Sequence, residues 1–579
     1  MDVNINDDGG YFLWLSDLHF DPHYATSQAF TSHYYEDANC NSISSSIGNY
    51  GCDSPRSLVR AALEHAVNVT AARTPSSPAF VIVSGDSIRH GVDQLFAGGE
   101  FKEGAEGRIN NTFSANLGVE QAANSPYHAQ AMDAAGEIMH EVISMVEMAF
   151  PEAEIIVSIG NNDVVPDYYL QLQDEDAPLG SSNLTSESAG MLGVIFNALS
   201  NGANSTTIAE GKPNGTSKNT ILTSHDEWTF LRGGYYSRNL HNGTLTVISL
   251  NTVLYSGNFK PGPKNGDDPG WQFSWMRKML SYCRENGTQA VIVGHIPPAV
   301  GSFRHTQLWK DKYIQTYYEI VKEFDNVIIA QLFGHLHSDE FRVGLADESD
   351  STANLSMIPS MNTPLLLGPS VTPLHGNDPS FRIVKYGRGG GGSETQDGKY
   401  RLLDYDSHRC SIGTDNHWSK LYTFSEAYDM ASDVIKEEGL TSEAFRTIVK
   451  SMEDKRGKES PVLTSYRSLM LSGADGDGHD KRGSNFGCDS KCRDEFLCTF
   501  QTATRSGYDN CLLERKQTWK RNGRSIFGLV GAVVFATALI FLVIVRWRKK
   551  RRRDHYESTP SVTDGNKDSD IDAKDQEMI

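Results

Sequence analysis

Residues 11–20 read YFLWLSDLHF, an apolar run that ends in an aspartate and a histidine. Short runs of aromatic and β-branched residues bounded by polar turns predict buried strands. The same arrangement recurs along the chain in AFVIVSGDS (79–87), AEIIVSIGNND (153–163), LTVISLNT (245–252), AVIVGHIPP (290–298) and NVIIAQLFGHLH (326–337). Two further runs, FRIVKY (381–386) and YRLLDYD (400–406), also predict strands.

Helical patterns lie between several of these strands. Residues 54–72 and 128–150 place apolar side chains at the spacing of one helix face. Alternation of strand and helix predicts a layered α/β domain. In such sheets the site lies beyond the carboxyl ends of the strands, which is where the polar turns of this chain fall.

The polar turns carry side chains that bind metal ions. Aspartate, histidine and asparagine supply oxygen and nitrogen ligands, and a carboxylate can bridge two cations. In any one of these turns, the aspartate is more often a helix cap and the histidine more often a hydrogen-bonded structural residue. A series of such turns behind successive strands is hard to obtain by chance. The predicted ligands are Asp17, His19, Asp86, Asn161, His295, His335 and His337.

Composition limits the class of partner. The formal net charge is -20 at pH 7, and an acidic surface repels a phosphate backbone. We therefore expect no nucleic-acid partner, and we expect any phosphorylated substrate to be bound through metal ions.

Residues 526–545 (IFGLVGAVVFATALIFLVIV) form an uncharged run, and RWRKKRRR follows at 546–553. About 20 apolar residues suffice to cross a bilayer, and a basic flank normally stays cytosolic. We predict a single-pass membrane protein with a lumenal or extracellular catalytic part, in the lysosome, the vacuole or at the cell surface, and a cytosolic tail. The first residues lack the pattern of a signal peptide, so we expect that the true N-terminus is missing.

Glycosylation and cysteine usage agree with that orientation. Asn-x-Ser/Thr sequons begin at Asn68, Asn110, Asn183, Asn204, Asn214, Asn242, Asn286 and Asn354. All eight cysteines precede the predicted span, which favours disulfides, and Cys40 and Cys52 flank a loop that is easily closed. Four cysteines near the C-terminus could instead form a zinc ribbon, and Cys283 and Cys410 could pair or stay buried thiols.

The series D-x-H, G-D, G-N-x-D, G-H and G-H-x-H resembles the calcineurin-like metallophosphoesterase family. Within it, WLSDLHFDPHY, VISLNT and GPSVTPLHGNDPSFRIVKY resemble the acid sphingomyelinase-like branch. The resemblance implies a four-layer α/β/β/α catalytic domain at 11–410 and a helical region at 411–520, which the predicted membrane helix at 526–545 and the tail at 546–579 follow. It also implies disulfides between Cys488 and Cys492 and between Cys498 and Cys511.

The resemblance further implies two divalent metal ions. Asp17, His19 and His337 would hold one ion, Asn161, His295 and His335 the other, and Asp86 would bridge them. Zinc is favoured, with manganese or iron possible. Two such ions clamp phosphoryl oxygens and activate a bridging water for in-line attack.

One position departs from the family pattern. Relatives carry a catalytic histidine in G-N-H, and this chain has Asn162, which can donate a hydrogen bond but cannot act as a general acid. His90, at the offset of a histidine in the acid sphingomyelinase branch, is the predicted proton donor, although a surface histidine at a helix start remains the alternative.

The resemblance implies that the protein is a dinuclear-metal phosphoesterase that hydrolyses a phosphodiester, as an acid sphingomyelinase-like phosphodiesterase. Two other functions stay open. GDSIRH and GNND also resemble endopolyphosphatases, in which Arg89 could bind an additional phosphate. The substrate is therefore a phosphorylated small molecule, a lipid or polyphosphate. The alternative of another class is a catalytically weak lumenal protein that binds phosphorylated ligands.

Overall fold

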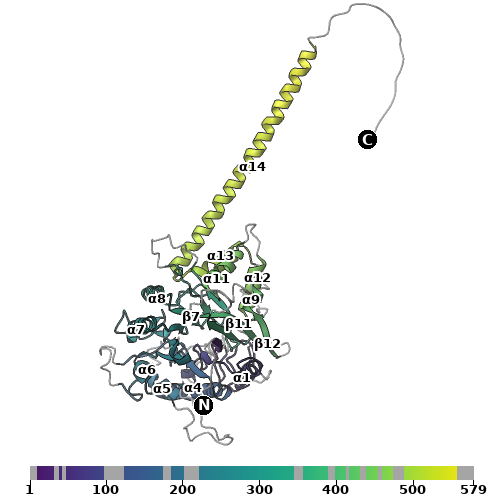
Figure 1. Ribbon diagram of the computed structural model, residues 1–579. Helices are drawn as coiled ribbons and strands as arrows, with labels where there is room; N and C mark the ends of the chain where they lie inside the picture. Colours follow the sequence, from purple (N-terminus) through teal and green to yellow (C-terminus); the bar gives the residue numbers. More distant parts are fainter. Residues whose placement is uncertain are drawn as a thin grey trace, which may run out of the picture. The chain divides into compact units, whose positions relative to one another are not determined.

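The computed structural model describes residues 9–31, 38–41, 47–96, 123–173, 184–200, 221–344, 356–388, 398–412, 416–430, 439–453, 460–473 and 488–556. For 518–532 and 554–556 only the backbone is described. The chain divides into two units, Met1–Leu512 and Leu513–Ile579, and all the strands belong to the first unit (Figure 1).

The first sheet has the strand order β12-β11-β10-β1-β2-β3. β1, β2 and β3 run parallel, whereas β10 pairs with β1 in the antiparallel sense and β11 and β12 continue that sense. The strands are β1 (Gly9–Leu15), β2 (Phe80–Val83), β3 (Glu154–Val157), β10 (Ser380–Arg388), β11 (Tyr400–Cys410) and β12 (Trp418–Thr423). The predicted strands of this sheet are confirmed, and β12 is an addition.

The second sheet has the order β4-β5-β6-β7-β9-β8. β5, β6, β7 and β9 are parallel, and β4 and β8 form antiparallel edges. The strands are β4 (Tyr236–Leu240), β5 (Leu245–Ser249), β6 (Gln289–Val293), β7 (Ile328–Phe333), β8 (Glu340–Arg342) and β9 (Leu365–Leu367). β4, β8 and β9 were not predicted, because they are short or mix polar with apolar residues.

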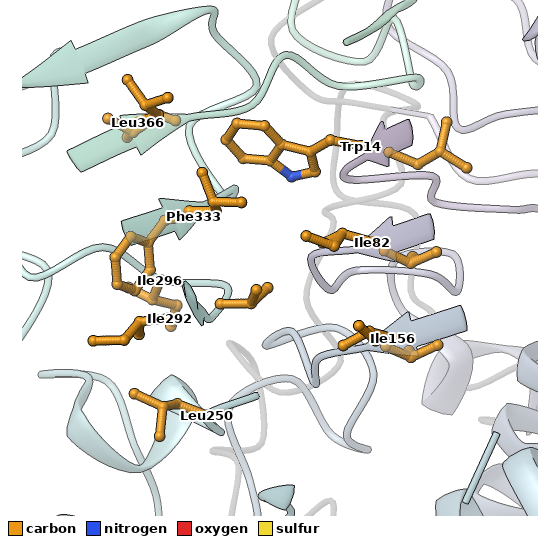
Figure 2. Packing of buried hydrophobic residues seen from close by; sticks show 14 of the residues in the cluster. Trp14, Ile82, Ile156, Leu250, Ile292, Ile296, Phe333 and Leu366 are labelled. Atoms are coloured by element: carbon orange, nitrogen blue, oxygen red, sulfur yellow. The ribbon is translucent and has the colours of Figure 1, made fainter. Parts of the chain in front are cut away.

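The two sheets pack face to face. Figure 2 shows Trp14, Ile82 and Ile156 of the first sheet turned toward the second sheet, whose strands carry Phe333 and Leu366. These side chains are buried, and Ser158 and Ser249 join the sheets at a hydroxyl–hydroxyl distance of 2.9 Å. Burial on both faces explains why the strands read as continuous apolar runs.

Helices flank the paired sheets, α1 against the first sheet at β12 and α7 against the second at β6. The predicted helices at 54–72 and 128–150 are confirmed as α1 (Arg56–Ala71) and α4 (His128–Ala149). The other helices of this part are α5 (Met191–Ser200), α6 (Glu227–Gly233), α7 (Gln272–Glu285) and α8 (Asp311–Glu323).

The region after β12 is helical, as predicted. It contains α9 (Phe424–Ala427), α11 (Ser442–Ser451), α12 (Pro461–Met470) and α13 (Ser490–Gln501), and α14 (Arg505–Tyr556) follows. The three predicted disulfides are confirmed: Cys40–Cys52, Cys488–Cys492 and Cys498–Cys511. This excludes the zinc ribbon, and Cys283 and Cys410 are buried thiols.

Among the residues that the structure describes, no helix is long and apolar enough to cross a membrane. The predicted span at 526–545 begins within 518–532, whose side chains are not described. That segment therefore stays a prediction.

Candidate metal centre

The seven predicted ligands gather where strands of both sheets end. Each follows the last residue of its strand within a short turn: two come after β1, one after β2, one after β3, one after β6 and two after β7. Backbone hydrogen bonds tie these turns together, because the amide of Asp17 donates to the Gly85 carbonyl and that of Gly334 to the His295 carbonyl. The two sheets thus share one site at their carboxyl edge.

Asp17, His19 and His337 form the first cluster. The Nε2 atoms of His19 and His337 lie 3.2 Å apart, and Nε2 of His337 lies 3.3 Å from Oδ1 of Asp17. The three ligand atoms lie within 4.8 Å of one another. This is the arrangement that one cation requires.

Asp86, His295 and His335 form the second cluster, again within 4.8 Å. Asn161 joins it, since its Oδ1 lies 3.2 Å from Nε2 of His295. Oδ2 of Asp86 lies 3.1 Å from Nε2 of His295 and 3.5 Å from Nε2 of His19 in the first cluster. Asp86 is therefore placed between the two clusters.

The backbone at these positions is strained. The φ angles are 49° at Asp17, 40° at His19, 52° at Asp86, 74° at His335 and 53° at His337. Left-handed φ is uncommon for residues with a Cβ, and it concentrates at functional sites where the surroundings enforce it. Five strained positions in one cluster indicate that the turns are shaped for the convergence of their side chains.

Glycines before the ligands leave room for that convergence. A Cβ at Gly85, whose φ is 91°, would come within 2.7 Å of the His295 ring. A Cβ at Gly160 would collide with the Asp86 carboxylate, and one at Gly334 with the Ser16 hydroxyl. The glycine in each of the G-D, G-N and G-H turns is thus required by packing at the site.

The donor set fits metal ions. Burial and the charge of His90 lower the pKa of His19 well below its usual value, and burial with His295 lowers that of His335 to about 3. Burial raises the pKa of Asp86, but His295 outweighs burial and holds it well below its usual range. Burial lowers the pKa of His295, but the charge of Asp86 outweighs burial and raises it to about 9. Neutral imidazoles such as His19 and His335 beside an ionised carboxylate are the forms that bind cations.

Asn162 and Asp163 organise the bridging carboxylate. Nδ2 of Asn162 donates to Oδ2 of Asp86 at 2.7 Å, and its backbone amide donates to Oδ1 at 2.8 Å. The carboxylate of Asp163 accepts the amides of Asp86, Ser87 and Gly160. The Asn162 amide thus orients Asp86.

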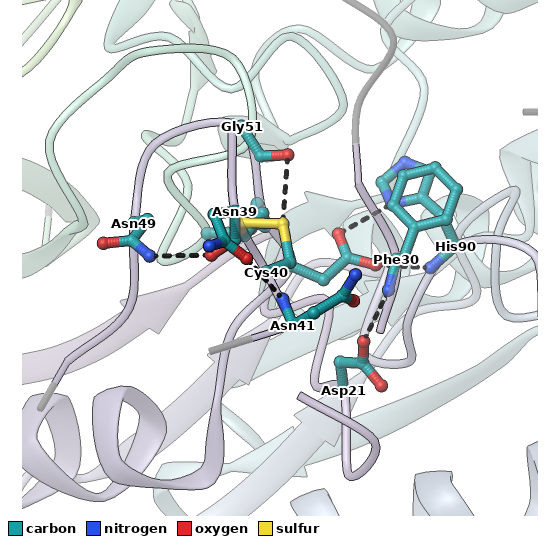
Figure 3. Close-up of a disulfide and its surroundings, with 11 residues drawn as sticks. Asp21, Phe30, Asn39, Cys40, Asn41, Asn49, Gly51 and His90 are labelled. Atoms are coloured by element: carbon teal, nitrogen blue, oxygen red, sulfur yellow. Dashed lines mark hydrogen bonds and ion pairs between the residues drawn. A yellow bond between two sulfur atoms is a disulfide. The ribbon is translucent and has the colours of Figure 1, made fainter. Parts of the chain in front are cut away.

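His90 lies beside the first cluster. Its ring stacks on His19 at a centroid distance of 4.0 Å and on Phe30 at 4.9 Å, and Figure 3 shows the stack with Phe30. Nδ1 of His90 lies 2.9 Å from Oδ1 of Asp53. Burial lowers the pKa of His90, but the charge and hydrogen bond of Asp53 outweigh burial and raise it to about 9.

Arg89, the residue predicted to bind an additional phosphate, is buried and pairs within the protein. Its side chain is 2% exposed, and Nη1 donates to Oδ1 of Asp21 at 3.0 Å and to the Gln28 carbonyl at 2.7 Å. Its Nε donates to the His90 carbonyl. This position argues against contact with a substrate phosphate, because the guanidinium already joins the His90 turn to the loop after Asp21.

Sequence reasoning missed two residues of the site. Asp53, which is buried, was not singled out because it lies 37 residues before its partner His90. His375 packs edge-on against His337 with ring centroids 4.5 Å apart. Both are lone polar residues in loops, which carry no periodic signal.

Three of the predicted glycosylation sites are described, and Asn68, Asn242 and Asn286 are exposed. Asn110, Asn183, Asn204, Asn214 and Asn354 lie outside the described residues.

Comparison with known proteins agrees with this chemistry. No family model matches the chain. It is 26% identical over 388 residues to Sphingomyelinase phosphodiesterase D of Dictyostelium discoideum, covering 66% of the chain and 67% of that protein. It is 23% identical over 515 residues to human Cyclic GMP-AMP phosphodiesterase SMPDL3A, covering 87% and 90%.

Among solved structures, a dimetal phosphatase from Danio rerio matches with a TM-score of 0.33 and 12% identity, covering 65% of this chain and 95% of that one. At that score the structural likeness carries no weight.

Proposed function

We propose that this chain, a metal-dependent phosphoric ester hydrolase homologous to the acid sphingomyelinase-like phosphodiesterases, hydrolyses a phosphodiester with an alcohol leaving group. The observation that carries the proposal is the position of Asp86, whose Oδ2 lies 3.5 and 3.1 Å from imidazole nitrogens of two separate clusters. A carboxylate between two nitrogen-rich clusters is suited to bridge a pair of cations.

Asp17, His19 and His337 would hold one cation, and Asn161, His295 and His335 the other. We propose that both cations are zinc. Two such ions would polarise the phosphoryl group and activate water. The chain's own contribution is to fix these ligands: Asn162 holds Asp86 by two hydrogen bonds, and the Ser84 carbonyl lies 2.9 Å from Nδ1 of His295.

His90 would protonate the leaving oxygen. Its Nδ1 is engaged by Asp53, so Nε2 is the nitrogen that can reach a substrate. The ring lies against the ligand His19 and is 18% exposed. A protonated histidine beside the cluster is the general acid that an alkoxide leaving group requires.

The surroundings of His90 favour a diester over polyphosphate. The charges of Asp53 and Asp167 raise the pKa of His90, and those of Asp93 and Asp53 raise the pKa of Asp167. Burial and the charge of Asp93 raise the pKa of Asp167 to about 8, so this side of the site already disfavours a further negative charge. A polyanion extending past His90 would add charge to it, and Arg89 already pairs with Asp21.

The assay is a side-by-side comparison of sphingomyelin, cyclic GMP-AMP and long-chain polyphosphate with the full-length protein. We expect a diester to be turned over with the highest kcat/KM. A kcat/KM for polyphosphate above both diesters would contradict the proposal and favour an endopolyphosphatase. Asp86→Asn serves as the control for metal-dependent turnover.

We also propose a lumenal or extracellular catalytic part on a single-pass membrane protein. The exposed sequons at Asn68, Asn242 and Asn286, the three disulfides, and the run of exposed apolar side chains at 533–545 before the basic residues support it. Enzymatic deglycosylation of protein from eukaryotic cells should lower its apparent mass. An unchanged mass, with the catalytic part digested by protease added to the cytosolic side, would contradict this placement.

A further inference from the structure

The ring of His90 is held on three sides. His19 and Phe30 stack on its two faces with interplanar angles of 17° and 19°. At its edge, Asp53 accepts from the His90 backbone amide with Oδ2 at 2.8 Å and lies 2.9 Å from Nδ1 with Oδ1. Both oxygens of one carboxylate therefore bind one residue, which leaves the imidazole a single orientation.

Asp53 is itself fixed from both sides along the chain. The preceding Cys52 is bonded to Cys40, and its carbonyl accepts the Thr372 hydroxyl. The following Ser54 donates its amide to the His19 carbonyl at 2.9 Å and accepts the amide of Asp21. The Asp53 side chain is fully buried. Figure 3 shows the disulfide, Gly51 and the stacked pair of Phe30 and His90 in one view.

The same disulfide loop supports the second face of the ring. Thr31, next to Phe30, forms an antiparallel bridge with Cys52, and the Phe30 amide donates to Oδ2 of Asp21. Asp53 and Phe30 thus depend on one covalently closed segment, although they approach His90 from different directions.

We propose that Asp53 is a positioning residue that holds the His90 imidazole with Nε2 available to the leaving-group oxygen, and that the Cys40–Cys52 disulfide keeps Asp53 in place. This inference rests on the proposed function of the site, since it assigns His90 the role of proton donor. A carboxylate on Nδ1 fixes which ring nitrogen carries the proton and where the other nitrogen lies.

One alternative uses the same atoms. Asp53, His90 and His19 lie close enough to form a third cation cluster. Against it, both Asp53 oxygens already accept from His90, and His19 is shared with the first cluster. Metal content therefore separates a ligand from a positioning residue.

The test is a double-mutant cycle in the full-length protein with Asp53→Asn and His90→Ala. Two substrates are compared: bis(4-nitrophenyl) phosphate, whose leaving group needs little protonation, and sphingomyelin, whose leaving group is an alkoxide. For sphingomyelin we expect kcat to fall by about 10-fold or more in Asp53→Asn, with KM nearly unchanged, because supporting partners typically contribute about 10- to 100-fold. For the aryl diester we expect a change of less than about threefold, because a good leaving group gains little from general acid catalysis.

In the His90→Ala background, Asp53→Asn should have no further effect on kcat, and the metal content should equal that of the wild type. The matched control is Asp226→Asn, since Asp226 is a buried carboxylate that binds a backbone amide and Arg238 away from the site. It should lower turnover of both substrates equally or not at all.

Three results would overturn the inference: equal losses for both substrates, an additional loss in the His90→Ala background, or loss of metal from Asp53→Asn. If the wild type shows no metal-dependent turnover, the proposed function fails instead. A crystal structure of Asp53→Asn then still decides the positioning role, because an unmoved His90 ring would refute it and a rotated ring would support it.

Discussion

The buried His408 pairs with the partly buried His65, and protonation of His408 should destabilise the protein in acid. Nδ1 of His408 lies 3.1 Å from Nε2 of His65, the His408 ring stacks on Phe381, and its residue is 3% exposed. Burial and His65 lower the pKa of His408 from 6.5 to about 4, and Arg73 and Lys420 add to this while Asp406 opposes it. The pKa of His65 is also lowered, by burial and His417.

The direction of the change in stability with pH follows from proton linkage. The unfolded histidine binds a proton below about pH 6.5, whereas the folded one resists it until about pH 4. Stability is therefore fully present above the unfolded pKa and falls as the pH drops through this window. At about 1.4 kcal/mol per pKa unit, the loss from His408 amounts to roughly 3 kcal/mol.

Urea unfolding of the full-length protein at pH 7, 5.5 and 4 measures this loss. His408→Phe keeps an aromatic ring against Phe381 but cannot titrate, so the free energy of unfolding should fall less with acidification than in the wild type, by about 3 kcal/mol. Removal of the exposed His225 serves as the control and should leave the wild-type dependence intact. Parallel pH dependences of wild type and His408→Phe would refute the reasoning.

Three further outcomes are expected. Asp86→Asn should lower the metal content below two ions per chain and reduce diester turnover by about 10³-fold or more, because it removes the negative charge that the two cations would share. Elemental analysis measures the metal content, and full retention of two ions would contradict this prediction. Asn162→Ala removes a hydrogen bond to a charged carboxylate, so kcat/KM should fall by about 10- to 100-fold, and an unchanged value would refute its orienting role. Replacing Cys40 and Cys52 by serine should lower the free energy of unfolding by about 3 kcal/mol and reduce sphingomyelin turnover more than aryl diester turnover. Equal losses of turnover for the two substrates would show that the disulfide does not act through His90.

The parallel strands and the seven ligand candidates could be predicted from sequence because their signal is local. Each strand is an apolar run, and each ligand follows it within a glycine-containing turn, as in Gly85-Asp86 and Gly294-His295. Order along the chain then places these turns at one edge of a sheet. The structure adds the reason for the glycines, whose missing Cβ atoms make room for neighbouring ligands.

The features that could not be predicted from the sequence depend on pairing between residues that lie far apart in the chain. The antiparallel half of the first sheet sets Gly9 opposite Gly387, a register that no local pattern specifies. Arg89 looked available for phosphate because its partner Asp21 lies 68 residues away. Asp53 was overlooked for the same reason, since its role exists only once the disulfide loop brings it to His90.

Metal content measured together with turnover tests the central claim most directly. The purified full-length protein should contain two divalent ions per chain and hydrolyse bis(4-nitrophenyl) phosphate, lose both ions and activity with a chelator, and recover both on addition of zinc. Protein that binds no metal and shows no turnover, or that retains full turnover after its metal is removed, would contradict the account.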